Sequence, residues 1–266
     1  MNWGKMKTLF IYLFVALNAV LLTFYVYTVQ KNKTEIVQEK EIIERAMKND
    51  NITVEDNATK RDNLGYVNVT ISDLKDIRKE DSGLKYEVEN VDKTSTLKVS
   101  SENVITNVNK GSYRAELDSF LLEKLKLSAN YVFSSYNANK NEVIYEQQID
   151  SFRVFSNKNA RIVFSVESNG DIKHFTLTGV SNIRKDKNET LVASNQAINR
   201  LYHEDLIPKN CRVRATLGYY TYISQTENQV LIPTWNVEIS DKDGQVSNYY
   251  VDAINLNILN GKGHSS

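Results

Sequence analysis

The first hydrophobic pattern along the chain is an apolar run close to its start. No residue from position 8 to position 30 carries a formal charge. About 20 apolar residues, at about 1.5 Å of helix each, cross the hydrocarbon core of a bilayer. Trp3, Tyr25 and Tyr27 lie near the ends of the run, where aromatic side chains favour the membrane interface. The pattern therefore predicts a transmembrane helix over residues 8–30 after a cytoplasmic tail of residues 1–7.

A cleaved signal peptide is the alternative interpretation of this run. Its apolar region would span about 7–15 residues and end in a small-x-small cleavage site. The observed run is longer, and it ends in the bulky sequence Tyr25-Val26-Tyr27-Thr28, so we expect an uncleaved anchor. Basic residues flank both ends, and the count of positive charges does not fix the orientation. Because a large body behind a lone N-terminal anchor is usually exported, we expect the N-terminus inside and the body outside the cell membrane.

Asn18 is a polar residue near the middle of the apolar run. An amide in hydrocarbon is costly unless it finds a hydrogen-bond partner. Ala16 and Ala19 are close to Asn18 in the sequence, and small residues allow a second helix to approach closely. We therefore expect Asn18, Ala16 and Ala19 to contact a partner within the membrane. In the alternative, Asn18 bonds only the backbone of its own helix.

The segment after the apolar run is strongly charged. Residues 31–55 predict a juxtamembrane helix and linker, with Glu41 four residues before Arg45 in the favourable acid-first order. Ile36, Ile43 and Met47 form a short apolar stripe. This pattern fits a solvated stalk, and a coiled coil with a partner is the alternative.

Residues 56–180 alternate polar and apolar positions and predict a first α+β unit with extra N-terminal strands. An amphipathic helix is expected from Tyr113, followed by strands. Asn169-Gly170 is the strongest short signal for a two-residue hairpin turn. Such a turn places Phe164 opposite Phe175 on the face predicted to form the core.

Residues 181–266 repeat this order and predict a second α+β unit. A helix is expected from Leu191, followed by a long strand over residues 212–223. A final hairpin with a four-residue loop at residues 241–244 places Trp235 opposite Tyr250 in the predicted core. The expected fold is therefore α+β: a transmembrane helix followed by two repeated units, each a helix packed on an antiparallel sheet.

Composition and charge exclude several classes of function. With 33 basic and 33 acidic side chains the chain lacks the basic excess of a nucleic-acid-binding protein. A single cysteine, Cys211, excludes an internal disulfide and a cysteine-based zinc cluster. No HExxH, GxSxG or Gly-rich phosphate loop occurs, and the adjacent His203-Glu204-Asp205 cannot converge on a helix. We therefore expect no catalytic residue, no metal and no cofactor.

The two ends of the chain carry a family resemblance. The start MNWGKMKTLFIYLFVALNAVLL and the end QVLIPTWNVEISDKDGQVSNYYVDAINLNIL resemble the YycI (WalI) family, and the similarity covers essentially the whole chain. The closing hairpin is shared more loosely with YycH proteins and PepSY-like modules. The resemblance implies a non-enzymatic regulator that pairs with a YycH-like companion and the sensor histidine kinase WalK of the WalK/WalR (YycG/YycF) two-component system, and so tunes cell-wall turnover.

Two other classes remain as alternatives. An exported binding module could take up a peptide or cell-wall fragment on the free face of a sheet or in the cleft between the repeats. An inhibitor of an exported protease would follow only from analogy with PepSY-like folds.

Overall fold

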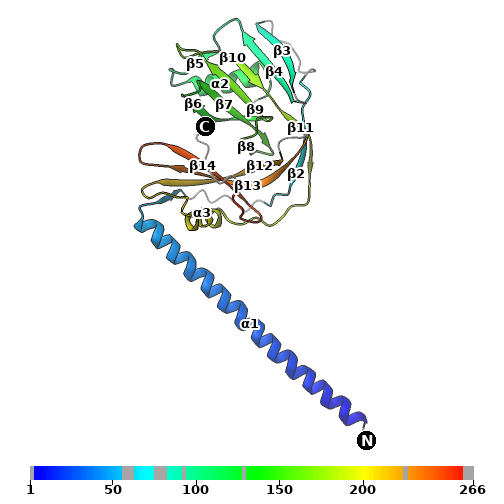
Figure 1. Cartoon of the computed structure of the whole chain (residues 1–266). Helices are drawn as coiled ribbons and strands as arrows, with labels where there is room; N and C mark the ends of the chain where they lie inside the picture. The colour runs from blue at the N-terminus through cyan, green and yellow to red at the C-terminus, as the bar shows by residue number, and fades with distance from the viewer. Residues whose placement is uncertain are drawn as a thin grey trace. The chain divides into compact units, whose positions relative to one another are not determined.

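The computed structural model describes residues 3–55, 63–74, 83–91, 94–127, 130–223 and 227–259. The chain divides after residue 53 into two compact units, and each is described by itself. The fold is α+β, with an apolar N-terminal helix and a large, mostly β-sheet body (Figure 1).

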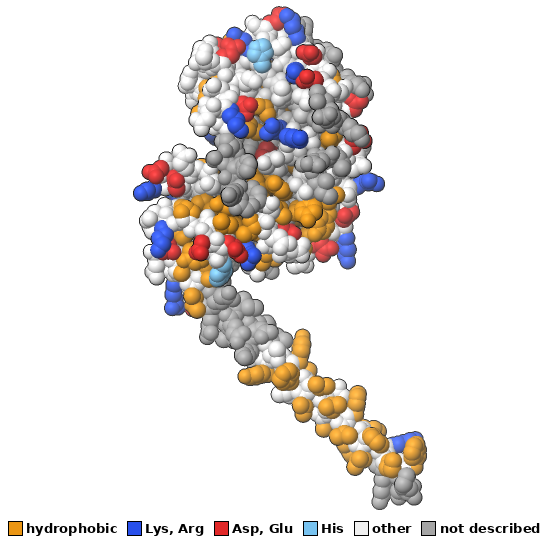
Figure 2. Space-filling model, in the orientation of Figure 1, with side chains coloured by type: hydrophobic (Ala, Val, Ile, Leu, Met, Phe, Trp, Pro, Cys, Tyr) orange, Lys and Arg blue, Asp and Glu red, His pale blue; other side chains and the backbone are white. Residues whose placement is uncertain are grey.

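The first unit consists mainly of one long helix, α1 (Trp3–Asn49). Its segment Met6–Thr28 has a mean hydropathy of 2.3 and is long and apolar enough to cross a membrane. Figure 2 shows hydrophobic side chains along this part of the helix. The helix is consistent with the predicted single-pass anchor. Within the charged half, Arg45 Nη2 lies 3.3 Å from Glu41 Oε2, as the spacing predicts. The side chain of Ile36 lies outside the described residues.

The second unit is built on fourteen described strands. Along the main path, the order of hydrogen-bonded neighbours is β11-β2-β13-β12-β8-β7-β9-β10-β4-β3. Outside this path β1 pairs with β12, β14 with β13, β5 with β10 and β6 with β7. The strands are β1 (Thr53–Glu55), β2 (Val67–Ile71), β3 (Leu84–Val91), β4 (Thr94–Ser101), β5 (Thr106–Asn107), β6 (Tyr131–Asn137), β7 (Glu142–Ile149), β8 (Phe152–Phe155), β9 (Arg161–Val166), β10 (Asp171–Leu177), β11 (Val180–Lys185), β12 (Arg212–Ile223), β13 (Asn228–Ser240) and β14 (Val246–Asp252).

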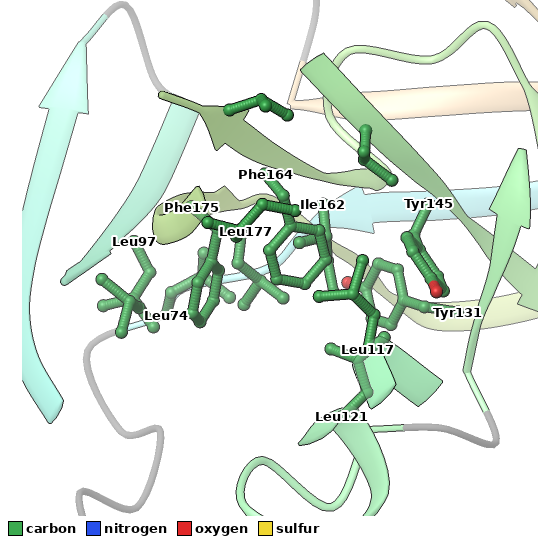
Figure 3. Close-up of a cluster of buried hydrophobic side chains, with 14 residues drawn as sticks. Leu74, Leu97, Leu117, Leu121, Tyr131, Tyr145, Ile162, Phe164, Phe175 and Leu177 are labelled. Atoms are coloured by element: carbon green, nitrogen blue, oxygen red, sulfur yellow. The ribbon is translucent and has the colours of Figure 1, made fainter. Parts of the chain in front are cut away.

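The helix α2 (Tyr113–Glu123) contributes to a buried hydrophobic cluster. Leu117 and Leu121 of α2 are buried together with side chains of β7, β9 and β10, and Figure 3 shows them gathered around Phe164. The ring centroids of Phe164 and Phe175 lie 5.1 Å apart. The hydroxyl of the fully buried Tyr145 donates to Asp118 Oδ1 of α2 at 2.9 Å, and that of Tyr131 donates to Thr178 O at 2.8 Å, so both buried hydroxyls have partners.

The hairpin β9–β10 has the predicted register but a different turn. Phe164 pairs with Phe175, as predicted. The turn has three residues, because Glu167 N donates to Asp171 O at 2.8 Å and Gly170 takes a positive φ of 88°. A three-residue loop alone would move the register by one. A bulge between Ile172 and His174 restores it.

The helix α3 (Ser194–His203) begins three residues later than predicted. Its residues Ala197, Ile198 and Leu201 are buried. In β12 the predicted alternation is observed, since the odd-numbered positions 213–219 are buried. Trp235 of β13 is 4% exposed, and its Nε1 donates to Val192 O, just before α3, at 3.0 Å.

The hairpin β13–β14 does not have the predicted register. Trp235 pairs with Val251, and Tyr250 pairs with Asn236. The loop has three residues instead of four: Asp241 N donates to Gln245 O at 3.0 Å, and Gly244 has a φ of 79°. The register therefore differs from the prediction by one residue, which moves Tyr250 to the sheet face opposite Trp235.

The strands of the two expected units pair with one another. β2, which belongs to the expected first unit, pairs with β13 of the expected second unit. β8 pairs in parallel with β12, with Gly218 opposite Arg153. The sheet is therefore continuous across residue 180, where the sequence suggested a boundary.

Candidate functional site

The polar position of the apolar helix is satisfied locally. Asn18 Nδ2 donates to Phe14 O of its own helix at 2.8 Å. Thr23 Oγ1 bonds Ala19 O in the same way at 2.8 Å. For the Asn18 carbonyl oxygen, no hydrogen bond is found among the described residues. The side chain is therefore able to accept a bond from outside the helix while its amide nitrogen is already paired.

Helical geometry does not bring the three predicted residues of the span together. A residue advances about 100° around an α-helix, so Ala16 points about 200° away from Asn18 and Ala19 about 100° away. Residues one and two apart do not face each other on a helix. A single partner helix could contact Ala16 and Ala19, or Asn18, but not all three at close range.

One face of the body carries an aromatic group that the sequence did not place. On the side of β12–β14 opposite Trp235, the ring of Tyr250 lies 4.8 Å from Tyr220 and 5.8 Å from Phe155, by centroids. A Cβ on Gly218 would overlap the Phe155 ring, so the absence of a side chain there makes room for this stack. We call Phe155, Tyr220 and Tyr250 the tyrosine cluster.

Two apolar side chains are exposed near opposite ends of the sheet formed by β12, β13 and β14. Tyr222, at the end of β12, is 69% exposed, and Val246, at the start of β14, is 44% exposed. Figure 2 shows hydrophobic side chains over β12–β14 in the lower part of the second unit. The rings of the tyrosine cluster are themselves buried or half-buried, whereas Tyr222 is exposed, and exposed aromatic side chains are common at binding surfaces.

A buried carboxyl group lies beside the tyrosine cluster. Glu146 of β7 is only 8% exposed, and its Oε1 accepts a hydrogen bond from Ser156 N at 2.9 Å. Burial raises the pKa of the Glu146 carboxyl, against the opposing effects of the Ser156 bond and of Arg153 and Arg161. Burial also raises the pKa of Tyr250, and the charge of Glu146 adds to that rise. Glu146 could not be recognised as buried from the sequence, because it occupies a polar position in an alternating strand.

The residues that could support catalysis are dispersed. His174 on β10 and His203 at the end of α3 are both exposed, and His264 lies outside the described residues. Cys211 is buried with its Sγ 3.1 Å from Pro208 O, and burial raises the pKa of its thiol, which favours the unreactive form. In the described part of the chain, no group of three His, Cys, Asp or Glu side chains has the arrangement of a metal site.

The described features define a class of protein: an apolar N-terminal helix followed by an α+β body that consists mostly of β-sheet. The chain belongs to the YycI family, since the family described as YycI protein matches residues 30–254. Membership implies a regulatory accessory role in the WalK/WalR system. The family is not known as enzymatic.

Two solved structures are similar to this chain at low identity. An uncharacterized protein from Eubacterium rectale ATCC 33656 has 9% identity and a TM-score of 0.45, covering 80% of this chain and 92% of that chain. The Bacillus megaterium YpeB C-terminal domain has 12% identity and a TM-score of 0.43, covering 73% of this chain and 87% of that chain. No curated protein matches the chain.

Proposed function

We propose that this protein is a non-enzymatic, single-pass membrane regulator that associates with the sensor histidine kinase WalK and a YycH-like companion. Its N-terminus lies in the cytoplasm and its body outside the cell membrane. Through these contacts it modulates the two-component signalling that controls cell-wall metabolism. The observation that carries the proposal is the match to the YycI family over residues 30–254, supported by the helix Met6–Thr28, which is long and apolar enough to span a bilayer.

We also propose that the body contains two copies of one unit, residues 56–180 and 181–266. The order of a helix followed by a hairpin supports this: α2 precedes β9–β10, and α3 precedes β13–β14. Both hairpins close with a three-residue turn whose glycine has a positive φ. Each helix would pack on the antiparallel sheet of its own unit.

The membrane helix would supply part of the specificity for the partners. The carbonyl oxygen of Asn18 can accept a bond from a polar group of a neighbouring helix, and such bonds in membranes contribute about 0.6–2 kcal/mol. Losing about 1 kcal/mol weakens association roughly five-fold. The small side chains of Ala16 and Ala19 would allow a second helix to approach on another side of α1.

The test is co-purification of WalK and the YycH-like protein with the full chain from detergent. We would compare wild type with Asn18→Leu and with a version whose residues 8–30 are replaced by an unrelated anchor. Thr28→Val is the matched control, since Thr28 also bonds its own helix backbone but lies about 80° from Asn18 and at least about 120° from Ala16 and Ala19 around the helix. We expect partner recovery to fall roughly five-fold for Asn18→Leu, to fall further for the replaced anchor and to remain unchanged for Thr28→Val.

Two outcomes would contradict parts of this proposal. Full recovery with the replaced anchor would place the contact in the body and refute a role for Asn18. Failure of wild type to recover either partner would refute the association itself.

A second candidate is an exported binding module for a peptide or cell-wall fragment. The exposed side chain of Tyr222 favours it, because exposed aromatic side chains are common at binding surfaces. Under this alternative, Tyr222→Ser would remove binding of the fragment and leave recovery of WalK unchanged.

A further inference from the structure

The strand β6 forms an edge of the sheet. Among the described strands it pairs with β7 alone, whose other side pairs with β9 and β8 (Figure 1). Gln148 N donates to Asn130 O at 2.7 Å, and bonded and non-bonded pairs alternate from there along an antiparallel ladder. The N–H and C=O of Phe133 therefore point away from β7. An edge with such groups can pair with a further strand.

Other edge strands carry charges that β6 lacks. The strand β3 ends the order of strands on one side, with Lys85 and Glu87 exposed. The strand β11 ends it on the other side, with Arg184 and Lys185 exposed. Charged side chains on an edge strand oppose pairing with another chain. The seven residues of β6, Tyr131–Asn137, include no charged residue, so this opposition is absent there.

A bulge brings two aromatic side chains of β6 to the same face. Phe133 and Tyr136 are three residues apart and would point to opposite faces of a regular strand. The register shifts between Phe133 and Ser135, which adds one residue and places both rings on the side of α2. Their centroids lie 6.5 Å and 6.4 Å from that of Tyr113. Tyr136 is 38% exposed, so the group reaches the surface.

Arg114 of α2 lies over this aromatic group. Its Cζ is 3.9 Å from the centre of the Phe133 ring, and its Nε donates to the Tyr113 hydroxyl at 3.3 Å. Asp118, one turn further along α2, accepts the hydroxyl of Tyr145. Within the described ranges, no carboxylate is found in an ion pair with Arg114, and its side chain is exposed. The two terminal nitrogens of a guanidinium fixed in this way can donate to one carboxylate together.

The free edge and the guanidinium would act on the same added strand. Such a strand would lie about 4.8 Å from β6. The residue opposite Phe133 would point to the same face, with its Cβ about 5.5 Å away, and a carboxylate there would reach Arg114.

We propose that the edge of β6 binds an extended peptide segment of a partner protein, which places a carboxylate on Arg114 and an apolar side chain against Tyr136. In strand addition of this kind, backbone hydrogen bonds give affinity and the side chains give specificity. The site is distinct from the apolar helix, and the inference goes beyond the association with WalK and does not depend on it.

The test measures binding of a fluorescently labelled peptide, Thr-Val-Thr-Glu-Thr-Val-Thr, to the full chain in detergent by fluorescence anisotropy. We expect Arg114→Gln to weaken binding about tenfold, because a charge-assisted hydrogen bond is lost. Arg184→Gln is the matched control, since Arg184 is also an exposed arginine of the sheet but lies on β11, and binding should be unchanged. A peptide with Lys in place of Glu should bind Arg114→Glu more tightly than it binds wild type.

Methylation of the peptide's backbone nitrogens tests the pairing itself. Methyl groups along one edge of the peptide should abolish binding, and methyl groups along the other edge should leave it unchanged, because only one edge faces β6. Equal effects of the two methylated peptides would overturn strand addition.

Three further outcomes would overturn the proposal. The first is failure of wild type to bind the peptide, or equal binding by wild type and Arg114→Gln. The second is loss of binding in Tyr222→Ser but not in Arg114→Gln, which would place the peptide at the end of β12. The third comes from sedimentation without peptide: dimers of wild type that Tyr136→Lys abolishes would show that a second copy of the chain occupies the edge.

Discussion

The hairpins β9–β10 and β13–β14 have the same type of turn, but a bulge follows the turn in β9–β10 and none follows it in β13–β14. Each closes with a three-residue loop that ends in a glycine of positive φ, Gly170 or Gly244. In β9–β10 a bulge after Ile172 compensates for the odd loop, and the aromatic residues pair as a two-residue turn would have paired them. In β13–β14 no register shift separates the turn from Trp235, and the pairing moves by one residue.

The difference shows that turn type and register are separate properties of a hairpin. The pairing of Phe164 with Phe175 was predicted correctly although the turn is one residue longer than predicted, because the unpredicted bulge shifts the register back by one. Where no bulge intervenes, the loop length alone decides which side chains share a face. Trp235 and Tyr250 are therefore placed on opposite faces although both strands were located correctly.

The largest expected effect is that of deleting one residue from each hairpin. Deleting Asn248 from β14 would shift the strand against β13 and move Val251 away from Trp235, at a cost of more than about 4 kcal/mol. Deleting Lys173 would remove only the bulge residue and its ion pair with Glu167, which costs less than about 1.5 kcal/mol. Urea unfolding of the full chain in detergent, followed by circular dichroism, measures both. Equal costs would show that the bulge does not protect the register.

The next effect concerns the aromatic side chains of β13 and β14. Trp235→Ala should destabilise the body by about 3–5 kcal/mol, because the ring is buried and its Nε1 bonds Val192 O. Tyr250→Ala should cost less, since Tyr250 is only partly buried. In a double-mutant cycle their coupling should stay below about 0.5 kcal/mol, whereas Tyr250 and Phe155 should couple by about 0.5–1.5 kcal/mol. Strong coupling between Trp235 and Tyr250 would show that the two side chains share a face of the sheet, as the sequence predicted.

The smallest effect separates the two turn glycines. Gly244→Ala should cost about 1 kcal/mol, from the positive φ alone, because a Cβ there meets nothing within 4 Å. Gly170→Ala should cost about 2 kcal/mol, since a Cβ would also overlap the side chain of Asn109 and lie 2.8 Å from Asn107 Oδ1. Thermal melts of the two variants, run side by side, show which substitution costs more stability. A larger cost at Gly244 would mean that the loop around Gly170 adapts.

The sequence predicted what depends on local pattern. Uncharged length identified the helix Met6–Thr28, alternation identified β12, and Asn169-Gly170 located the hairpin that holds Phe164. What it missed depends on contacts between distant segments. The pairing of β8 with β12 brings Phe155 against Gly218, and no local pattern encodes that contact.

The candidate sites follow the same division. Asn18 was recognisable as a polar residue in an apolar run, but its hydrogen bond to Phe14 could not be distinguished from a bond to a partner. Glu146 was unrecognisable, because its burial depends on segments outside its own strand, such as Ser156, whose N–H bonds the carboxyl group. Burial of a polar residue is a tertiary property, and alternation within one strand does not report it.

The unbroken helix α1 gives its residues a fixed angular phase over its whole length. With about 100° per residue, Ile43 and Met47 both point within about 20° of the direction of Asn18, although they lie some seven turns away. Both are buried at the far end of the helix. Inserting one residue between positions 28 and 41 would rotate Asn18 by about 100° with respect to them, and inserting seven would nearly restore the phase. The continuous helix therefore fixes the direction of Asn18 around the helix axis relative to that of Ile43 and Met47.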